Sequence, residues 1–110
     1  MKRRTGFVSN SSSTSFTIKN KSNESKTLVD FVKENSHLVN QFNDYYDYNY
    51  TLDELIEDAV NEDVSFEPGE EKILSFGDHD GNALGHVYDY ILRDGGESDN
   101  FEWIFYEMNR

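Results

Sequence analysis

A short run of residues in the second half of the chain carries side chains of the kinds that bind calcium. Asp78, Asp80 and Asn82 alternate in the manner of calcium-loop ligands. A calcium loop of this kind needs glycine at its sixth position and glutamate at its twelfth. Here Gly81 is fourth and Asp89 is twelfth, so the run fits a turn built from Asp, Gly and Asn better than a metal site. We therefore predict no metal ion at this segment.

The sequence contains none of the common catalytic motifs. It has no nucleophile elbow, phosphate-binding loop, dinucleotide fingerprint or zinc-binding His-Glu-x-x-His segment. The serines of residues 9–15 have no base nearby, and His37, His79 and His86 show no metal-ligand spacing. Arg93 stands in an acidic stretch, and we expect it to pair with a carboxylate across a hairpin. We predict no catalytic residues, no cofactor and no enzymatic activity.

Residues 44–50 form the segment best suited to contact another protein, because they combine tyrosines with aspartates. Tyrosine offers a large contact area at a low entropy cost, and aspartate adds charge. The alternative is an ordinary loop whose rings cover the ends of neighbouring helices. The candidate partner-binding residues of this segment are Asp44, Tyr45, Tyr46, Asp47, Tyr48 and Tyr50.

Four carboxylates follow at spacings that place them side by side on a helix. Asp53 and Glu57 are four residues apart, as are Glu54 and Asp58, so each pair is adjacent on a helical surface. Rows of carboxylates can imitate the phosphates of DNA and occupy the basic cleft of a nucleic-acid-binding protein. The alternative is a solvated helix face, which is what most charge runs are. We count these four residues among the candidate partner-binding residues.

Charge is distributed unevenly along the chain. Residues 1–26 carry six basic residues and one acidic residue, a net +5, whereas residues 27–110 carry four basic and 21 acidic residues, a net −17. The acidic body should repel nucleic acid and anionic membrane, so we expect a basic protein partner and no direct nucleic-acid binding. The sequence has no cysteine, no membrane-spanning apolar run and no signal-peptide core. These features predict a cytoplasmic protein.

Hydrophobic periodicity predicts the elements that must position these residues. Residues 25–42 and 52–61 repeat apolar side chains at helical spacing, and residues 43–50 connect them. Thr51 and Glu54 form a capping box at the start of the second helix. The expected strands are residues 16–19, 72–76, 84–92 and 101–108, and residues 64–66 also alternate in the strand manner.

The predicted fold class is α+β, with an antiparallel sheet of three to five strands and two helices on one face, in the order β-α-α-β-β-β. The 110 residues suit one domain, which we expect over residues 16–110. A flexible, basic, serine-rich arm is expected over residues 1–15. The residues expected in the core are Leu28, Phe31, Leu55, Ile56, Val87, Ile91 and Trp103.

The chain opens with a basic stretch, then Gly6-Phe7-Val8-Ser9-Asn10 and a run of serines and one threonine that is closed by Phe16. This start resembles that of a group of uncharacterised small proteins of bacteriophages and bacteria, as do residues 87–96 and 101–103. The resemblance implies an origin in a phage or mobile element. It implies no activity, because none is assigned to the group, and it identifies no site residue.

These observations favour a non-enzymatic accessory protein of a phage or mobile element. It would bind a basic host protein through its acidic, Tyr-rich surface during host takeover, and a DNA mimic is the narrower form of this hypothesis. Two alternatives remain open. One is a structural or virion-associated small protein that docks through its N-terminal arm, and the other is a small hydrolase or metal-binding protein.

Overall fold

The computed structural model describes residues 13–77 and 82–109 of the chain. Within these ranges it shows four helices, a four-stranded antiparallel sheet and a separate two-stranded sheet. This architecture confirms the predicted α+β class with an antiparallel sheet. No helix of the described residues is long and apolar enough to cross a membrane.

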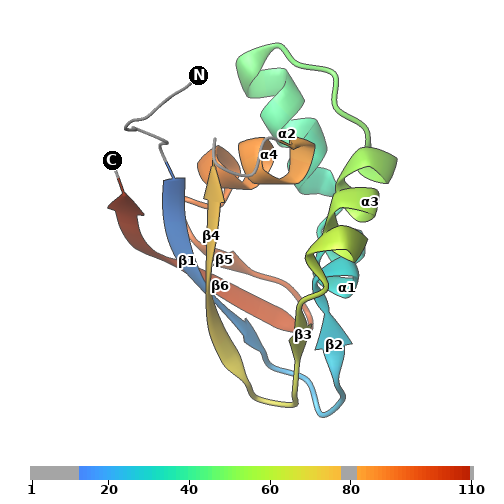
Figure 1. Ribbon diagram of the computed structural model, residues 1–110, viewed down its shortest axis with the longest axis vertical. Coiled ribbons are helices and arrows are strands. Elements are labelled where there is room, and N and C mark those ends of the chain that lie inside the picture. Colours follow the sequence, from blue (N-terminus) through green and yellow to red (C-terminus); the bar gives the residue numbers. More distant parts are fainter. Residues whose placement is uncertain (1–12, 78–81, 110) are drawn as a thin grey trace.

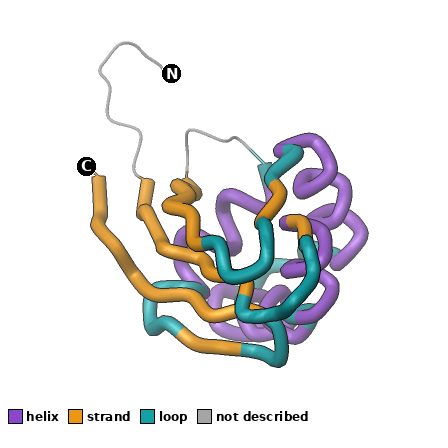
Figure 2. Tube along the Cα trace, turned by 90° about the horizontal axis from the view of Figure 1, so that it is seen from below, coloured by secondary structure: helices purple, strands orange, loops and turns teal. Residues whose placement is uncertain are grey.

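The large sheet has the strand order β4-β1-β6-β5, with β1 and β6 in the centre. The helices lie together on one side of this sheet (Figures 1 and 2). The strands are β1 (Ser13–Asn20), β2 (Lys26–Thr27), β3 (Ser65–Phe66), β4 (Glu71–Gly77), β5 (Gly96–Glu97) and β6 (Phe101–Asn109), and β2 pairs with β3 in the small sheet. The helices are α1 (Leu28–Glu34), α2 (His37–Tyr46), α3 (Leu52–Glu62) and α4 (Ala83–Ile91).

The strand β1 contains the predicted strand 16–19 and begins three residues before it. Phe16 and Ile18 are fully buried, as period-two alternation requires for a strand with one face on the core. The polar residues before them are also ordered, because β4 and β6 pair with both sides of β1. Thr14 is buried and donates a hydrogen bond to Asp89 Oδ1 at 2.6 Å. Residues 1–12 of the arm predicted over residues 1–15 lie outside the described residues, and residues 13–15 belong to β1.

The single helix predicted over residues 25–42 is wrong, because the structure has two helices that meet at Asn35. Thr27 caps α1 and forms a capping box with Asp30. Asn35 ends α1, and its buried side-chain amide donates to the Phe31 carbonyl at 3.0 Å. An asparagine that bonds the backbone in this way competes with helix continuation. The second helix, α2, then continues through Tyr46, into the segment predicted to be a connection.

The helix predicted over residues 52–61 is confirmed as α3. The Thr51 hydroxyl accepts from the Glu54 N–H at 3.2 Å, and Glu54 Oε2 accepts from the Thr51 N–H at 3.0 Å, so the predicted capping box is present. The helix ends at Asp63, which adopts the left-handed conformation with φ of 53°. Leu55 and Ala59 are the fully buried residues of its apolar face.

The strand predicted over residues 84–92 is wrong, because these residues form α4. Asn82 caps this helix by accepting from the Gly85 N–H at 2.8 Å. Leu84, Val87 and Tyr88 are buried at helical spacing. Asn82 was assigned to a turn with residues 78–81, which lie outside the described residues. The described chain therefore has four helices where two were expected, and the predicted element order changes accordingly.

Because residues 83–91 form a helix, the ion pair predicted for Arg93 across a hairpin is also wrong. Arg93 binds Asp89, four residues earlier on α4, with Nη2 and Oδ1 3.2 Å apart. This ion pair joins the last turn of α4 to the turn that follows the helix, and it does not cross a hairpin. Its guanidinium also lies 4.5 Å from the centre of the Tyr90 ring, within the range of a cation–π contact.

A buried aromatic cluster fills the space between the helices and the sheet. Phe31 lies at its centre and meets Tyr88, Phe101 and Trp103 edge to face, with ring centroids 5.2–5.6 Å apart. Gly96 is needed beside it, because a Cβ atom there would lie 2.7 Å from the Trp103 ring. Of the residues predicted to be buried, Leu28, Phe31, Leu55, Val87 and Trp103 are confirmed, whereas Ile56 and Ile91 are partly buried against the core.

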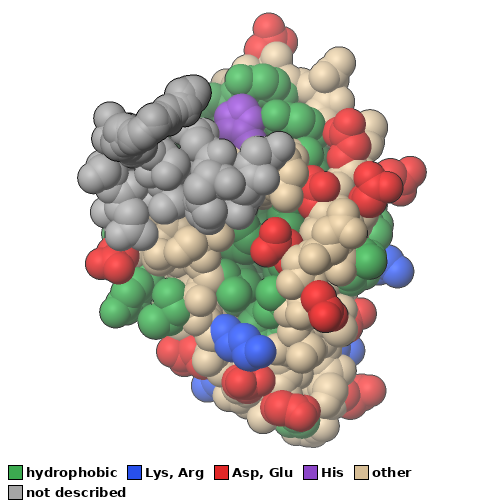
Figure 3. Space-filling model, viewed as in Figure 1, with side chains coloured by type: hydrophobic (Ala, Val, Ile, Leu, Met, Phe, Trp, Pro, Cys, Tyr) green, Lys and Arg blue, Asp and Glu red, His purple; other side chains and the backbone are tan. Residues whose placement is uncertain are grey.

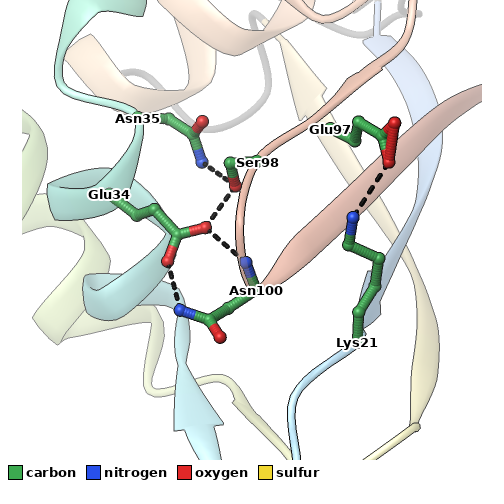
Figure 4. Close-up of polar contacts among 6 residues, drawn as sticks. All are labelled: Lys21, Glu34, Asn35, Glu97, Ser98 and Asn100. Carbon is green, nitrogen blue, oxygen red and sulfur yellow. Dashed lines mark hydrogen bonds and ion pairs between the residues drawn. The ribbon is translucent and has the colours of Figure 1, made fainter.

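The turn between β5 and β6 is attached to α1 through Glu34 (Figure 4). Glu34 Oε2 accepts from the Asn100 N–H at 2.8 Å and from the Ser98 hydroxyl, while Oε1 accepts from the Asn100 side-chain amide at 2.7 Å. Partial burial raises the pKa of Glu34, but these hydrogen bonds to the carboxylate outweigh it, and the pKa lies below its ordinary value. The ionised carboxylate thus joins two segments that are far apart in sequence.

Candidate functional site

The predicted partner-binding residues lie on two successive elements. Asp44, Tyr45 and Tyr46 form the last turn of α2, and Asp47 ends it in the left-handed conformation with φ of 59°. Residues 48–50 then lead to α3, which carries the four carboxylates. The sharp change of direction at Asp47 turns the following tyrosines back towards α2, where they meet a buried ring.

Five rings surround Phe42, which is itself fully buried, and the six rings together form a surface aromatic cluster. Tyr48 and Tyr50 stack with an interplanar angle of 11° and a centroid separation of 5.5 Å. Their neighbours come from α2 and α4, and most keep part of their surface in solvent. The centroids of the five surrounding rings lie 4.9–6.3 Å from that of Phe42. These rings belong to Tyr46, Tyr48, Tyr50, His86 and Tyr90.

Tyr50 joins this cluster to the acidic helix. The Asn43 side chain holds its backbone at both ends, donating to the Tyr50 carbonyl at 2.8 Å and accepting from the Tyr50 N–H at 3.1 Å. The Tyr50 hydroxyl lies 2.9 Å from His86 Nδ1, at hydrogen-bond distance. Burial raises the pKa of Tyr50, and the neighbouring Tyr48 and Glu54 raise it further. The phenol is therefore protonated at neutral pH.

An acidic cleft of about 500 Å³ opens beside Tyr50, between α3 and the start of α4. Carboxylates from α3 line it together with the phenol of Tyr50 and the imidazole of His86. Asp and Glu side chains gather over the part of the surface where α3 lies (Figure 3). The lining residues are Tyr50, Glu54, Glu57, Asp58, Gly77, Asn82, Ala83 and His86. The segment that joins Gly77 to Asn82 lies outside the described residues.

The three carboxylates of the cleft differ in the structural contacts they make. Asp58 Oδ2 accepts from the Leu84 N–H at 3.1 Å, so it helps to cap α4 and is only partly exposed. Glu54 belongs to the capping box of α3. Glu57 is exposed, and no hydrogen bond or ion pair of its side chain is seen among the described residues. Glu57 is therefore the carboxylate of the cleft best placed to meet a partner.

The structure brings some of the predicted residues together and separates others. Tyr50, Glu54, Glu57 and Asp58 line the acidic cleft, and Tyr46 and Tyr48 belong to the adjoining aromatic cluster. The remaining residues point elsewhere: Asp44 and Tyr45 line a second groove between α2 and residues 94–97, and Asp53 and Asp47 are exposed outside the cleft.

Sequence reasoning missed the contribution of α4 to the site. His86 shows no metal-ligand spacing in the sequence, and its half-buried position beside Tyr50 was not predicted. Tyr90, four residues later, was not considered. The signal was present as Leu84, Val87 and Tyr88 at helical spacing, preceded by the capping residue Asn82.

The geometry of the cleft suits the binding of cationic side chains. Carboxylates pair with lysine or arginine, and tyrosine rings accept the stem of lysine or the plane of arginine. Arg93 on the Tyr90 ring shows that the aromatic cluster accepts a guanidinium. Among the described residues, no three His, Asp or Glu side chains come close enough together to hold a metal ion.

The fold and the site define a small α+β domain with an acidic cleft beside a tyrosine-rich surface. Comparison with protein-family models, with curated proteins and with solved structures finds no match for this chain.

Proposed function

We propose that this chain is a non-enzymatic accessory protein of a phage or mobile element that binds a basic host protein through the acidic cleft and the surface aromatic cluster. The observation that carries the proposal is the convergence of Glu54, Glu57 and Asp58 with Tyr50 and His86 around one cleft. The carboxylates of α3 and the nearby Tyr50 meet the sequence-distant His86 there, next to the tyrosines of residues 46–48.

Electrostatics supports a positively charged partner. Residues 27–110 carry a net −17, so their field attracts basic proteins and accelerates encounter with them. Carboxylates at the rim of an interface act mainly on the association rate and its salt dependence. Tyrosines supply contact area with few rotatable bonds, which favours affinity once the partner is docked.

The resemblance of the opening residues 4–16 supports the phage or mobile-element origin in this proposal, and the host-cell cytoplasm is the corresponding location. The narrower form is a DNA mimic, in which the α3 carboxylates take the places of phosphates. Exposed carboxylates at Asp53 and Glu57, one helical turn apart, support this form.

Charge reversal at two positions of α3 tests the proposal. Glu57 lines the acidic cleft, whereas Glu62 is an exposed carboxylate of the same helix outside it. The probe is a nine-residue peptide of alternating glycine and lysine, mixed with the full chain in stopped-flow measurements at low salt. We expect Glu57→Lys to slow association about fivefold or more, and Glu62→Lys, with the same change in net charge, to slow it about twofold.

Equal effects of the two variants would show that the peptide senses only the overall charge. That result, or the absence of binding by the wild-type chain at low salt, would contradict the proposed site. Circular dichroism of both variants controls for loss of the helix.

A further inference from the structure

The strand β6 has one side that is only partly occupied. It spans nine residues, but β5 pairs with just two of them, Glu102 and Trp103. Among the described residues, no strand lies beside Ile104–Asn109 on that side. Figure 2 shows this part of β6 at the outer border of the large sheet, with β1 on its other side.

The backbone of this segment presents hydrogen-bonding groups to the open side. The Phe101 carbonyl accepts from the Ser98 N–H at 2.8 Å, so it points away from β1 and towards the β5 side. Backbone groups alternate in direction along a strand, and the pairing of β6 with β1 is regular from Phe101 to Phe105. The N–H and carbonyl of Phe105 therefore point the same way, beyond the end of β5.

Three consecutive side chains of the open segment are large, apolar and exposed. Ile104 keeps 58% of its surface exposed, Tyr106 keeps 54% and Phe105 keeps 40%. Edge strands are normally protected by charge, proline, a β-bulge or a covering element, because an exposed apolar edge pairs with other chains. β6 carries one such irregularity, where its register with β1 shifts between Phe105 and Glu107. Three consecutive large residues at such an edge, in so acidic a chain, indicate an interaction surface.

A groove of about 410 Å³ accompanies the edge and is bordered by the residues that join α4 to β5. Asp94, Glu97 and Glu102 contribute carboxylates to its lining, while Ile104 and Phe105 contribute apolar surface. Its one positive lining group, Arg93, is already paired with Asp89. Glu97 is likewise paired with Lys21 at 2.9 Å, so Asp94 and Glu102 are the lining carboxylates with no ion pair among the described residues. An occupant that complements this lining is cationic and alternates charged with apolar side chains.

We propose that the open edge of β6 binds an extended, cationic segment of a partner protein, which adds to the sheet as a strand in line with β5. Backbone hydrogen bonds supply affinity in strand addition, and alternate side chains supply selectivity. A second copy of this chain is disfavoured as the occupant, because each copy carries a net charge of −12. This site lies on different elements from the acidic cleft and does not depend on it.

Two peptides of equal charge test the proposal with the full chain. One is a nine-residue peptide of alternating valine and lysine, which favours a strand, and the other is the glycine–lysine peptide, which does not. We expect the valine–lysine peptide to bind about tenfold more tightly, and to slow amide hydrogen exchange at residues 104–107. Glu57→Lys should leave this difference between the peptides unchanged, because it alters only the cleft.

Two substitutions at Phe105 separate the backbone contribution from that of the ring. Phe105→Pro removes the outward N–H, whereas Phe105→Ala removes the ring and keeps that donor. We expect Phe105→Pro to abolish the preference for the valine–lysine peptide and Phe105→Ala to retain most of it. If Phe105→Pro fails to fold, Ile104→Lys replaces it, because the exposed Ile104 side chain can change without disturbing the core.

Four outcomes would overturn the proposal. The first is equal binding of the two peptides, and the second is an unchanged preference in Phe105→Pro or Ile104→Lys. The third is a dimer of the free chain in sedimentation that Ile104→Lys dissociates, which would make a second copy the occupant. The fourth is a tenfold gain in valine–lysine binding when Lys2, Arg3 and Arg4 of the full chain become alanine, which would assign the edge to the chain's own N-terminal residues.

Discussion

Two aromatic clusters, each centred on a buried phenylalanine, stand in contrast within this small domain. The rings around Phe31 come from Tyr88, Phe101 and Trp103, are all buried, and meet Phe31 edge to face at 80–85°. The rings around Phe42 are four tyrosines and a histidine at angles of 24–72°, and most are partly exposed. The first cluster joins helix to sheet, whereas the second joins α2, α4 and the connection of residues 48–50, and it faces solvent.

The contrast shows that aromatic side chains can either stabilise the core or form an exposed surface suited to contact with a partner. In the buried aromatic cluster, edge-to-face contacts and complete burial both contribute to stability. In the surface aromatic cluster, one buried ring holds tyrosines in place while part of their surface stays exposed to solvent. The surface aromatic cluster buries less area, an arrangement that stability alone does not favour. It places tyrosine rings beside the carboxylates of the acidic cleft.

The largest expected effect separates the two clusters by stability. We expect Phe31→Ala to lower the free energy of unfolding by about 3–5 kcal/mol, because it leaves a cavity at the centre of the core. Tyr48→Ala should lower it by less than about 1 kcal/mol, since Tyr48 is an exposed member of the surface cluster. Urea unfolding of both variants measures this. Similar losses in the two variants would remove the distinction between the clusters.

A second prediction concerns the carboxylate that ties the β5–β6 turn to α1. At neutral pH, Glu34→Gln should lower the free energy of unfolding by about 1–2 kcal/mol, because hydrogen bonds to a charged group are lost. The pKa of Glu34 is lowered in the folded state, so its contribution is complete above its ordinary value of 4.5 and is lost as the pH falls through the lower, folded-state value. The difference between variant and wild type should therefore shrink in urea unfolding below pH 4.5. A difference that is constant from neutral to acidic pH would contradict this role.

The smallest expected effects compare one hydroxyl from each cluster. Tyr50 OH is bonded to His86, so Tyr50→Phe should lower the free energy of unfolding by about 1 kcal/mol. Tyr88 OH is buried and has no hydrogen-bond partner among the described residues, so Tyr88→Phe should leave stability unchanged or raise it by up to about 1 kcal/mol. Thermal unfolding of the two variants measures both changes. A larger loss of stability in Tyr88→Phe than in Tyr50→Phe would contradict the prediction that the Tyr50 hydroxyl contributes more to stability.

Local signals predicted the elements that are encoded by adjacent residues. The capping box of Thr51 and Glu54 identified α3, and the alternation in residues 16–19 and 101–108 identified β1 and β6. The break between α1 and α2 at Asn35 was not predicted, because the bond of Asn35 to Ser98, 63 residues away, is invisible in the sequence. For α4, apolar residues are so dense over 84–92 that a strand and a buried helix show the same pattern.

The residues of the candidate site that lie on correctly predicted elements were predicted, and those on the wrongly predicted element were not. Tyr50, Glu54, Glu57 and Asp58 were named and do line one cleft. His86 and Tyr90 were missed because they lie on α4, which was assigned as a strand. Asp44 and Tyr45 face a different groove, because α2 continues to Tyr46 and its turn geometry decides which way each side chain points.

The proposal that the acidic cleft and the surface aromatic cluster bind a basic partner can be tested by NMR, by mapping a basic peptide onto the isotopically labelled full chain. The measurement follows every backbone amide while the glycine–lysine peptide is added at low salt and then displaced by high salt. We expect the largest chemical-shift changes at Glu57, His86 and residues 48–50, and we expect them to vanish as the salt concentration rises. Shifts spread evenly over exposed carboxylates such as Glu62, Glu71 and Glu107, or concentrated away from the cleft, would contradict it.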